Sequence, residues 1–228
     1  VQTCALPICH TPKTANCISS DYVRSLALDS QHRLWIGTIN SLNIYNEQED
    51  NFNIYTSDPL ENGSLSQMSV RNIFMDTQGG MWLGTYFGGI NYYHPLKNRF
   101  RNLQFTAKPN SLNSNIINCI REDAQKGLWI GTNGGGVNYY NPQTGKFTHY
   151  TQKEGLGSND VKAIYIDEAN KQVYIGTHTG GLSILHRRSG QIETYNRNSR
   201  EKNIYAIEPT ETGDFWMSGM SSILRFNP

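Results

Sequence analysis

The strongest constraint on the fold is a short motif that recurs along the chain at nearly even spacing. Each copy places a large aromatic residue in an apolar run that ends in Gly-Thr or a variant of it. The aromatic residues are Trp35, Trp82, Trp129, Tyr174 and Trp216. Their separations are 47, 47, 45 and 42 residues (82 − 35, 129 − 82, 174 − 129, 216 − 174). A period in the forties predicts a β-propeller, in which each repeat forms one blade.

The first repeat shows what one blade contains. Its apolar runs lie at residues 23–29, 34–38, 42–45 and 52–55, and turn-forming residues separate them. Short runs rich in β-branched and aromatic residues are typical of strands, and no long helical periodicity competes with them. We therefore predict an all-β chain of four-stranded antiparallel blades. The five predicted units span residues 20–57, 69–106, 115–152, 160–196 and 201–228, and the last unit lacks a fourth strand.

Three kinds of residue recur for identifiable physical reasons. An Asp ends the first strand of a unit, where its carboxylate can accept hydrogen bonds from the turn that follows. The Trp is suited to packing between neighbouring blades. Glycines allow close backbone approach beside the second strand and positive φ before the third. These residues are Asp29, Asp76, Asp123 and Asp167; Trp35, Trp82, Trp129 and Trp216; Gly37, Gly84, Gly131 and Gly176; and the pairs at 88–89, 135–136 and 180–181.

Residues 1–19 precede the first unit and are predicted to form an N-terminal segment outside the propeller. The stretch from Val1 to Ile8 resembles translated sequencing-adaptor DNA, so roughly the first nine residues are interpreted as non-native. Cys4 and Cys9 belong to that stretch. The even number of cysteines therefore does not predict a disulfide framework.

Composition and spacing narrow the function classes. The 228 residues carry a net charge of +1 with 17% charged residues and no basic run, so nucleic acid is not an expected partner. The sequence contains no run of 18 apolar residues, so no membrane span is predicted. No His/Cys/Asp pattern has metal-ligand spacing, so neither a metal nor a cofactor is predicted. Gly134 to Gly136 precede a strand rather than a helix, which argues against a phosphate loop.

Two recurring features have a second interpretation. The aspartates at one turn position can be imagined as a ring of Ca²⁺ ligands, and the tryptophans as platforms for stacking sugars. Turn chemistry and core packing are the preferred interpretations, because both features hold a fixed place in the repeat.

Binding residues are sought where the repeats differ, because repeat proteins share scaffold residues and vary on the binding surface. One variable position is the second residue of the first strand, and others follow the second strand. In a propeller these positions lie along the axis and at one mouth. Aromatic, amide and cationic groups there suit a sugar, although each can also be an ordinary loop residue. The candidate ligand-binding residues are Arg24, Arg71, Asn118, Lys162, Tyr205, Tyr86, Phe87, Asn133 and His178.

The pattern V-x-x-I-x-x-D-x-x-G-x-L-W-I-G-T-x-x-G-G-V, with P-N-S-L-x-S-N between units, resembles the two-component regulator propeller repeat. The resemblance covers residues 20–228. It departs at Ile39-Asn40-Ser41, which lacks the Gly pair, at Tyr174, and at Ser218-Gly219. The resemblance implies the sensor region of Bacteroidetes hybrid histidine kinases, in which two seven-bladed propellers precede an immunoglobulin-like domain, a membrane helix and the kinase.

The function implied by the resemblance is a periplasmic, ligand-sensing propeller segment that responds to an oligosaccharide and is not itself an enzyme. Expected partners are that oligosaccharide, further blades and the immunoglobulin-like domain of the same protein, and a second protomer of the intact receptor. Contact with the inner membrane is expected only through segments outside this chain. The alternatives are a propeller lyase or glycosidase and a protein-interaction scaffold.

Closure of the propeller is a separate expectation. Seven blades are the family's number, so five units are expected to form an open arc. Its two end blades are expected to expose apolar faces, and such faces drive association.

Overall fold

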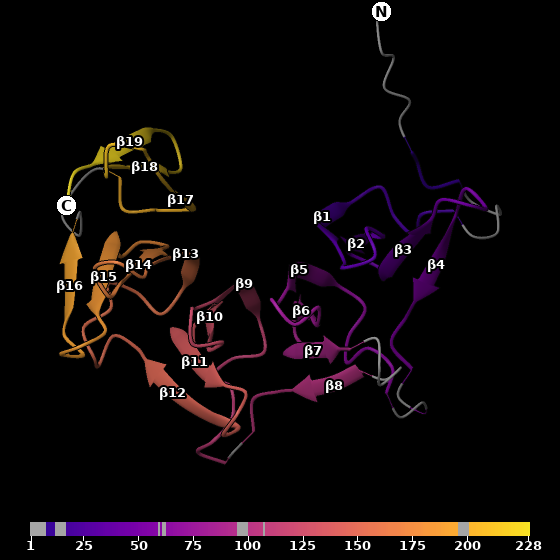
Figure 1. The fold of residues 1–228 in the computed structure, drawn as a ribbon, viewed down its shortest axis with the longest axis horizontal. Helices are drawn as coiled ribbons and strands as arrows, with labels where there is room; N and C mark the ends of the chain where they lie inside the picture. The colour runs from indigo at the N-terminus through magenta and orange to yellow at the C-terminus, as the bar shows by residue number, and fades with distance from the viewer. Residues whose placement is uncertain are drawn as a thin grey trace, which may run out of the picture. The chain divides into compact units, whose positions relative to one another are not determined.

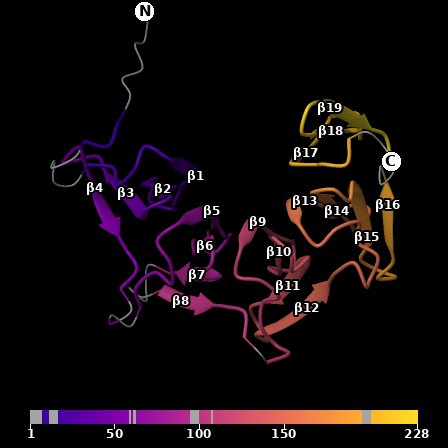
Figure 2. The same ribbon diagram turned by 180° about the vertical axis from the view of Figure 1, so that it is seen from behind.

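In a computed structural model, the chain forms five antiparallel sheets (Figures 1 and 2). The structure describes residues 8–11, 17–58, 60, 63–94, 100–106, 108–195 and 201–228. Within these ranges every regular element is a strand, which confirms the all-β prediction. The same ranges contain no helix suited in length and apolar character to crossing a membrane. Residues 1–7 of the segment interpreted as non-native lie outside them.

Each sheet corresponds to one predicted unit and is one blade, with neighbouring strands paired in chain order. Blade 1 contains β1 (Val23–Leu28), β2 (Leu34–Thr38), β3 (Leu42–Asn46) and β4 (Asn51–Tyr55). Blade 2 contains β5 (Val70–Met75), β6 (Met81–Thr85), β7 (Ile90–Tyr93) and β8 (Phe100–Leu103). Blade 3 contains β9 (Ile117–Glu122), β10 (Leu128–Thr132), β11 (Val137–Asn141) and β12 (Lys146–Tyr150). Blade 4 contains β13 (Val161–Asp167), β14 (Gln172–Thr177), β15 (Leu182–His186) and β16 (Ile192–Tyr195). Blade 5 contains β17 (Ala206–Pro209), β18 (Phe215–Ser218) and β19 (Ile223–Phe226).

The first strand of blade 5 begins later than its sequence predicts. The apolar run starts at Ile204, but β17 starts at Ala206. The backbone N–H of Ile204 donates instead to the carbonyl of Thr177 in blade 4, at 3.0 Å. A contact with the preceding blade therefore replaces pairing within the sheet.

The chain divides into two compact units, and each is described by itself. Unit 1 comprises Val1–Tyr86 and Asn91–Asn102, which include blade 1 and most of blade 2. Unit 2 comprises Phe87–Ile90 and Leu103–Pro228, which include blades 3, 4 and 5.

A buried aspartate organises the first turn of blades 1, 2 and 3. In blade 1, Asp29 Oδ1 accepts hydrogen bonds from the backbone N–H groups of Gln31 and Arg33, at 2.9 and 3.0 Å. Its Oδ2 accepts a third from the indole N–H of Trp35, at 2.9 Å. The turn role is thus confirmed, and the indole contact was not foreseen. The equivalent carboxylate–indole distances are 2.8 Å for Asp76 and Trp82 and 3.1 Å for Asp123 and Trp129.

These hydrogen bonds also set the charge state of the carboxylate. Burial acts to raise the pKa of Asp29, but hydrogen bonds from Trp35 and Arg33 outweigh burial and hold this pKa below its ordinary value. The Asp29 carboxylate therefore stabilises the fold at neutral pH, and this contribution is lost as the pH falls through the lowered pKa.

The aromatic face of one blade packs against the inner strand of the next. In unit 1, Trp35 shares a buried cluster with Val70 and Ile73. In unit 2, Trp129 shares one with Val161 and Ile164. The predicted close backbone approach at glycine is also present at these contacts. A Cβ atom on Gly37 would lie 2.8 Å from the carbonyl oxygen of Val70. A Cβ atom would lie 2.7 Å from Val161 Cγ1 if placed on Gly131, and 2.7 Å from the carbonyl oxygen of Ile204 if placed on Gly176.

An arginine adds an electrostatic link between blades 3 and 4. The Arg187 guanidinium donates to Asp123 Oδ2 at 2.9 Å and to Gln125 Oε1 at 2.6 Å. It also lies 5.7 Å from the centre of the Trp129 ring. The carboxylate that holds the indole of blade 3 therefore also binds blade 4.

Blades 4 and 5 depart from the aspartate–indole arrangement. Tyr174 donates its hydroxyl hydrogen to Gln172 Oε1 at 3.0 Å. In blade 5 the turn contains Thr210, and Trp216 is 49% exposed. Among the described residues no sheet covers Trp216, and its exposure agrees with the expectation that an end blade leaves an apolar face open.

The positions of Trp129 and Trp216 predict that the same substitution destabilises the fold to different degrees. Trp129→Ala removes a buried indole and the donor to Asp123, and we expect a loss of about 3–5 kcal/mol in the free energy of unfolding. Trp216→Ala removes a half-exposed ring, and we expect a loss below about 1 kcal/mol. Urea denaturation followed by circular dichroism measures both. Equal losses would mean that the two rings have similar surroundings.

Two glycines before β11 provide a second matched pair. Gly134 and Gly136 both have positive φ, of 81° and 72°. A Cβ on Gly134 would meet no atom within 4 Å, whereas one on Gly136 would collide with the carbonyl oxygen of Tyr150. Gly134→Ala should therefore cost about 1–2 kcal/mol from backbone strain, and Gly136→Ala clearly more. Thermal unfolding of the two variants, compared side by side, tests this order.

Candidate functional site

The predicted residues of the inner strands lie at β-bulges. The register of β1 with β2 shifts between Val23 and Ser25, and the same irregularity recurs in blades 2, 3 and 4. A bulge takes one residue out of the regular ladder and redirects its side chain. Tyr205 lies just before β17, where its N–H donates to the carbonyl of Ser218. The bulged residues are Arg24, Arg71, Asn118 and Lys162.

The predicted positions after the second strands lie beside these bulges. The backbone N–H of His178 donates to the carbonyl of Asp160 at 2.8 Å, two residues before Lys162. Tyr86 and Asn133 make the same contact, to Ser69 at 3.1 Å and to Ile116 at 2.9 Å. Antiparallel pairing therefore brings both kinds of variable position together within one blade.

In unit 2 these positions form a connected group across three blades, which we call the mouth cluster: Asn118, Asp160, Lys162, His178 and Tyr205. Asp160 Oδ1 accepts from Asn118 Nδ2 at 3.2 Å and pairs with Lys162 Nζ at 2.9 Å. Asn118 Nδ2 also donates to the carbonyl of Val161 at 2.7 Å. The Tyr205 hydroxyl lies 3.3 Å from His178 Nδ1.

The mouth cluster is polar and partly exposed to solvent. The side chains of Asp160 and Lys162 are each 19% exposed. Asn118 and His178 are half-buried, and Tyr205 is exposed. The result is a fixed ion pair flanked by an amide, an imidazole and a phenol, which together can donate and accept several hydrogen bonds.

Four of the nine predicted residues are thus brought together: Asn118, Lys162, His178 and Tyr205. Asn133 and Phe87 also belong to unit 2, where Asn133 accepts a backbone hydrogen bond from Ser114 Oγ at 2.8 Å and Phe87 is exposed.

The other three predicted residues belong to unit 1. Arg24 is exposed at its bulge, and the Arg71 guanidinium lies 5.1 Å from the centre of the Tyr86 ring. Arg71 and Tyr86 therefore form a local cation–π pair rather than part of the mouth cluster.

Asp160, the residue that connects the mouth cluster, was not predicted from the sequence. It precedes the first strand, and only strand and post-strand positions were compared. The equivalent positions of the other repeats are Tyr22, Ser69, Ile116 and Asn203, so this position varies as much as the selected ones. The variation at this position was therefore the signal by which Asp160 could have been identified from the sequence.

Buried polar residues on the third strands position the loops that lead to the bulges. Asn43 Oδ1 accepts from the backbone N–H of Ser19 at 2.9 Å, and Asn138 Oδ1 from that of Asn113 at 2.8 Å. These side chains are fully buried. They too were missed, although the asparagine recurs in the sequence. The remaining pairs are Asn91 with Ser66 and Ser183 with Gly157.

Glu201 holds the loop after the second strand of blade 5. Its carboxylate accepts from the backbone N–H of Asn203 at 3.0 Å and of Ser221 at 3.2 Å, and from Ser222 Oγ at 3.2 Å. Hydrogen bonds from the Asn203 and Ser221 backbone stabilise the ionised form and lower the pKa of Glu201 to about 2, from 4.5.

This lowered pKa predicts an acid transition of the loop. The contact is fully formed above pH 4.5, the ordinary value, and is lost as the pH falls through about 2. Carbon-13 NMR of the Glu201 carboxyl should show this titration, and Ser222→Ala should raise the pKa toward the ordinary value. A Glu201 that titrates at its ordinary pKa would contradict the geometry.

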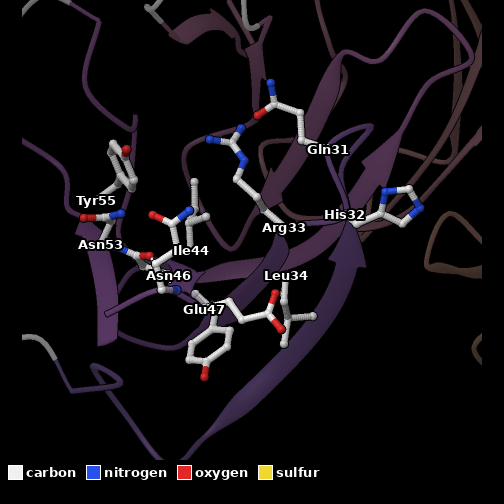
Figure 3. Close-up of a pocket in the computed structure, with 11 residues that line it drawn as sticks. Gln31, His32, Arg33, Leu34, Ile44, Asn46, Glu47, Asn53 and Tyr55 are labelled. Carbon is white, nitrogen blue, oxygen red and sulfur yellow. Dashed lines mark hydrogen bonds between the residues drawn. The ribbon is translucent and has the colours of Figure 1, made fainter. Parts of the chain in front are cut away.

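A groove of about 610 Å³ lies in unit 1, at the opposite end of the strands from Arg24. The β1–β2 and β3–β4 turns form it, with Gln31, Arg33, Asn46 and Tyr55 among its lining residues. Figure 3 shows the Arg33 side chain between Gln31 and the side formed by Asn53 and Tyr55, with His32 turned away.

Two polar groups of this groove already have protein partners. Arg33 Nε pairs with Asp29 Oδ2 at 2.7 Å, and the Tyr45 hydroxyl donates to Asp50 Oδ1 at 2.6 Å. The groove contains no predicted residue. In the part of the chain that the structure describes, no group of three or more His, Cys, Asp or Glu side chains could hold a metal ion.

Comparison with protein families gives three matches to the family described as the two-component regulator propeller. The matched residues are 17–40, 64–87 and 111–134. Each match runs from the incoming loop, through the bulge, to the residues after the second strand. No curated protein sequence matches the chain.

Solved structures share the fold. The extracellular domain of the hybrid two-component system BT3049 from B. thetaiotaomicron is 27% identical, with a TM-score of 0.83 over 92% of this chain. The chain spans 29% of the length of that domain. The extracellular domain of BT4673 from the same organism, at 24% identity and a TM-score of 0.52, matches over 90% of this chain and 36% of its own.

One similar structure is an enzyme. Virginiamycin B lyase from Staphylococcus aureus has a TM-score of 0.64 at 14% identity, over 90% of this chain and 70% of the lyase. At that identity the likeness concerns the fold alone.

Proposed function

The chain carries repeats of the two-component regulator propeller family, and from this premise we propose that it is a ligand-sensing segment of an extracytoplasmic sensor. The support is its likeness to the extracellular domain of a hybrid two-component system over 92% of its own length. The proposed location is the periplasm. The proposed ligand is an oligosaccharide, bound at the mouth cluster.

The single observation behind this proposal is the connectivity of the mouth cluster. Asp160 accepts from Asn118 of blade 3 and pairs with Lys162 of blade 4. Its backbone carbonyl binds His178, which contacts Tyr205 of blade 5. Positions that vary between repeats are therefore held in one arrangement by the architecture that the blades share, as expected of a binding surface.

The chemistry of the cluster suits a neutral polyhydroxyl ligand. The charge of Lys162 is balanced by Asp160 at 2.9 Å, so the pair offers one strong donor and one strong acceptor without excess charge. Asn118 and His178 add donors and acceptors, and the exposed ring of Tyr205 offers an apolar face. Sugars present alternating hydroxyl groups and C–H faces, which match such a surface.

The proposal predicts selective loss of affinity on substitution at the cluster. We expect an oligosaccharide from a panel of defined plant and host glycans to bind the chain in isothermal titration calorimetry. Tyr205→Ala and His178→Ala should each weaken binding about tenfold, the size of one lost contact. Tyr195→Ala is the matched control, because Tyr195 is as exposed as Tyr205 (37% against 38%) but lies on the outermost strand of blade 4.

Three outcomes would overturn the proposal. If no glycan of the panel binds, the proposed ligand is wrong. If Tyr195→Ala lowers the affinity as much as Tyr205→Ala does, the proposed binding site is wrong. Turnover of a bound glycan, detected as new reducing ends or unsaturated products by mass spectrometry, would favour the enzyme alternative instead.

A further inference from the structure

The groove of unit 1 lies where blade 1 departs from the repeat at two positions. In blades 2 and 3 a tyrosine of the third strand, Tyr92 or Tyr139, packs on a glycine of the first turn. In blade 2 a Cβ atom on this glycine, Gly80, would lie 2.5 Å from the Tyr92 ring. Blade 1 has Ile44 at the tyrosine position and Arg33 at the glycine position, and both residues line the groove. The shorter Ile44 leaves room where the other two blades hold a phenol ring.

The groove opens on the face of blade 1 that packs against blade 2. Ile44 shares a buried cluster with Val70 of blade 2. Asn53 pairs with Ile44 in register, and Tyr55 points to the same face because side chains alternate along a strand. Leu26, which is 60% exposed, lies on the opposite face of the sheet. The groove is therefore separate from the uncovered face of blade 1.

Arg33 offers two unused donor groups to the groove. Its Nε donates to Asp29 Oδ2 at 2.7 Å, so this carboxylate occupies one side of the guanidinium. Within the described ranges the two Nη atoms have no hydrogen-bonding partner, and the side chain is 41% exposed. Figure 3 shows this side chain between Gln31 and the side formed by Asn53 and Tyr55. The edge formed by the Nη atoms can donate two parallel hydrogen bonds to a carboxylate.

The groups around this edge allow a carboxylate to approach. Asp29 is only 5% exposed, and its charge is already compensated by the Arg33 pair. Figure 3 shows the Glu47 carboxylate away from the Arg33 guanidinium. Gln31 and Asn53 are exposed, and their side-chain amides have no hydrogen-bonding partner in the described part of the chain. Each amide can donate an N–H group to the same ligand.

The apolar part of the groove favours a flat ring. Ile44, which is 6% exposed, forms an apolar floor, and the Tyr55 ring, which is 42% exposed, forms an aromatic wall. Aromatic rings pair favourably in offset or edge-to-face arrangements. In blade 2 the corresponding ring, that of Tyr92, lies with its centre 4.2 Å from that of Trp82. The groove volume of about 610 Å³ is typical of small-molecule sites.

We propose that this groove binds a small aromatic carboxylate. The carboxylate accepts two hydrogen bonds from the Nη atoms of Arg33, and the ring lies over Ile44 against Tyr55. The groove belongs to unit 1 and shares no residue with the mouth cluster. It is therefore a second ligand site, for a ligand of different chemistry from the proposed oligosaccharide.

The test is titration of the nitrogen-15-labelled chain with phenylacetate, followed by NMR. We expect the Arg33 side-chain N–H and the Tyr55 backbone amide to shift, with a dissociation constant on the order of 1 mM for a ligand of about ten heavy atoms. Acetate lacks the ring and phenylacetamide lacks the charge. Each should bind at least about tenfold more weakly than phenylacetate.

Two variants locate the site. Arg33→Gln removes the guanidinium and should weaken phenylacetate binding at least about tenfold. Arg33→Gly combined with Ile44→Tyr recreates the pair of residues found in blades 2 and 3. This double variant should keep the fold and lose binding, because its own tyrosine ring fills the groove. Circular dichroism of both variants shows whether they are folded.

Arg188→Gln is the matched control, because Arg188 is an exposed arginine on the turn between β15 and β16, outside the groove. Its affinity for phenylacetate should equal that of the wild type. Absence of shifts at Arg33 and Tyr55, equal affinity for acetate or phenylacetamide, or unchanged affinity in the folded groove variants would each overturn the proposal. The measurement uses no glycan, so its outcome is independent of the proposed sensing function.

Discussion

The contact on which the first three blades depend is the hydrogen bond between a buried carboxylate and an indole. One aspartate closes the first turn with one oxygen and fixes the ring of the Trp with the other, as Asp29 does for Trp35. A fixed ring gives the sheet a flat apolar face, and the inner strand of the next blade packs on it. Turn, ring and inter-blade contact therefore form one unit of stability. In blade 3 the carboxylate that holds the indole is Asp123, and Arg187 of blade 4 binds this carboxylate as well.

Much of this fold was predictable because the repeat encodes it locally. The period gave the number of blades, and turn-forming residues gave strand limits that agree closely with the structure for Val23–Leu28 and Leu34–Thr38. Burial was predictable only where a neighbour exists. Trp216 occupies a repeat position that is buried in other blades. The residue type shows that the side chain can pack in a core, but it does not show whether a neighbouring sheet covers it.

The candidate site was predictable in part for a related reason. Comparing repeats selected Asn118, Lys162, His178 and Tyr205, and the structure brings them together. Asp160 was missed because its role is to connect blades. Such a role depends on which residues lie close together in the fold, and the comparison of strand positions does not reveal this. The bulges were missed because they interrupt the two-residue alternation by which a strand is recognised, so the sequence placed these residues in a regular ladder.

The bulges have a consequence for how such a surface diversifies. A residue at a bulge contributes little to the register of the sheet, because its neighbours on either side make the pairing contacts. Exchange of Lys162 or Asn118 for another side chain therefore leaves the backbone pairing within its blade intact, although it removes the contacts with Asp160. A single codon change can therefore place a different side chain at a bulge with no compensating change in the core. The side chains that a blade presents at its bulge can change in this way while the architecture of the blade stays the same.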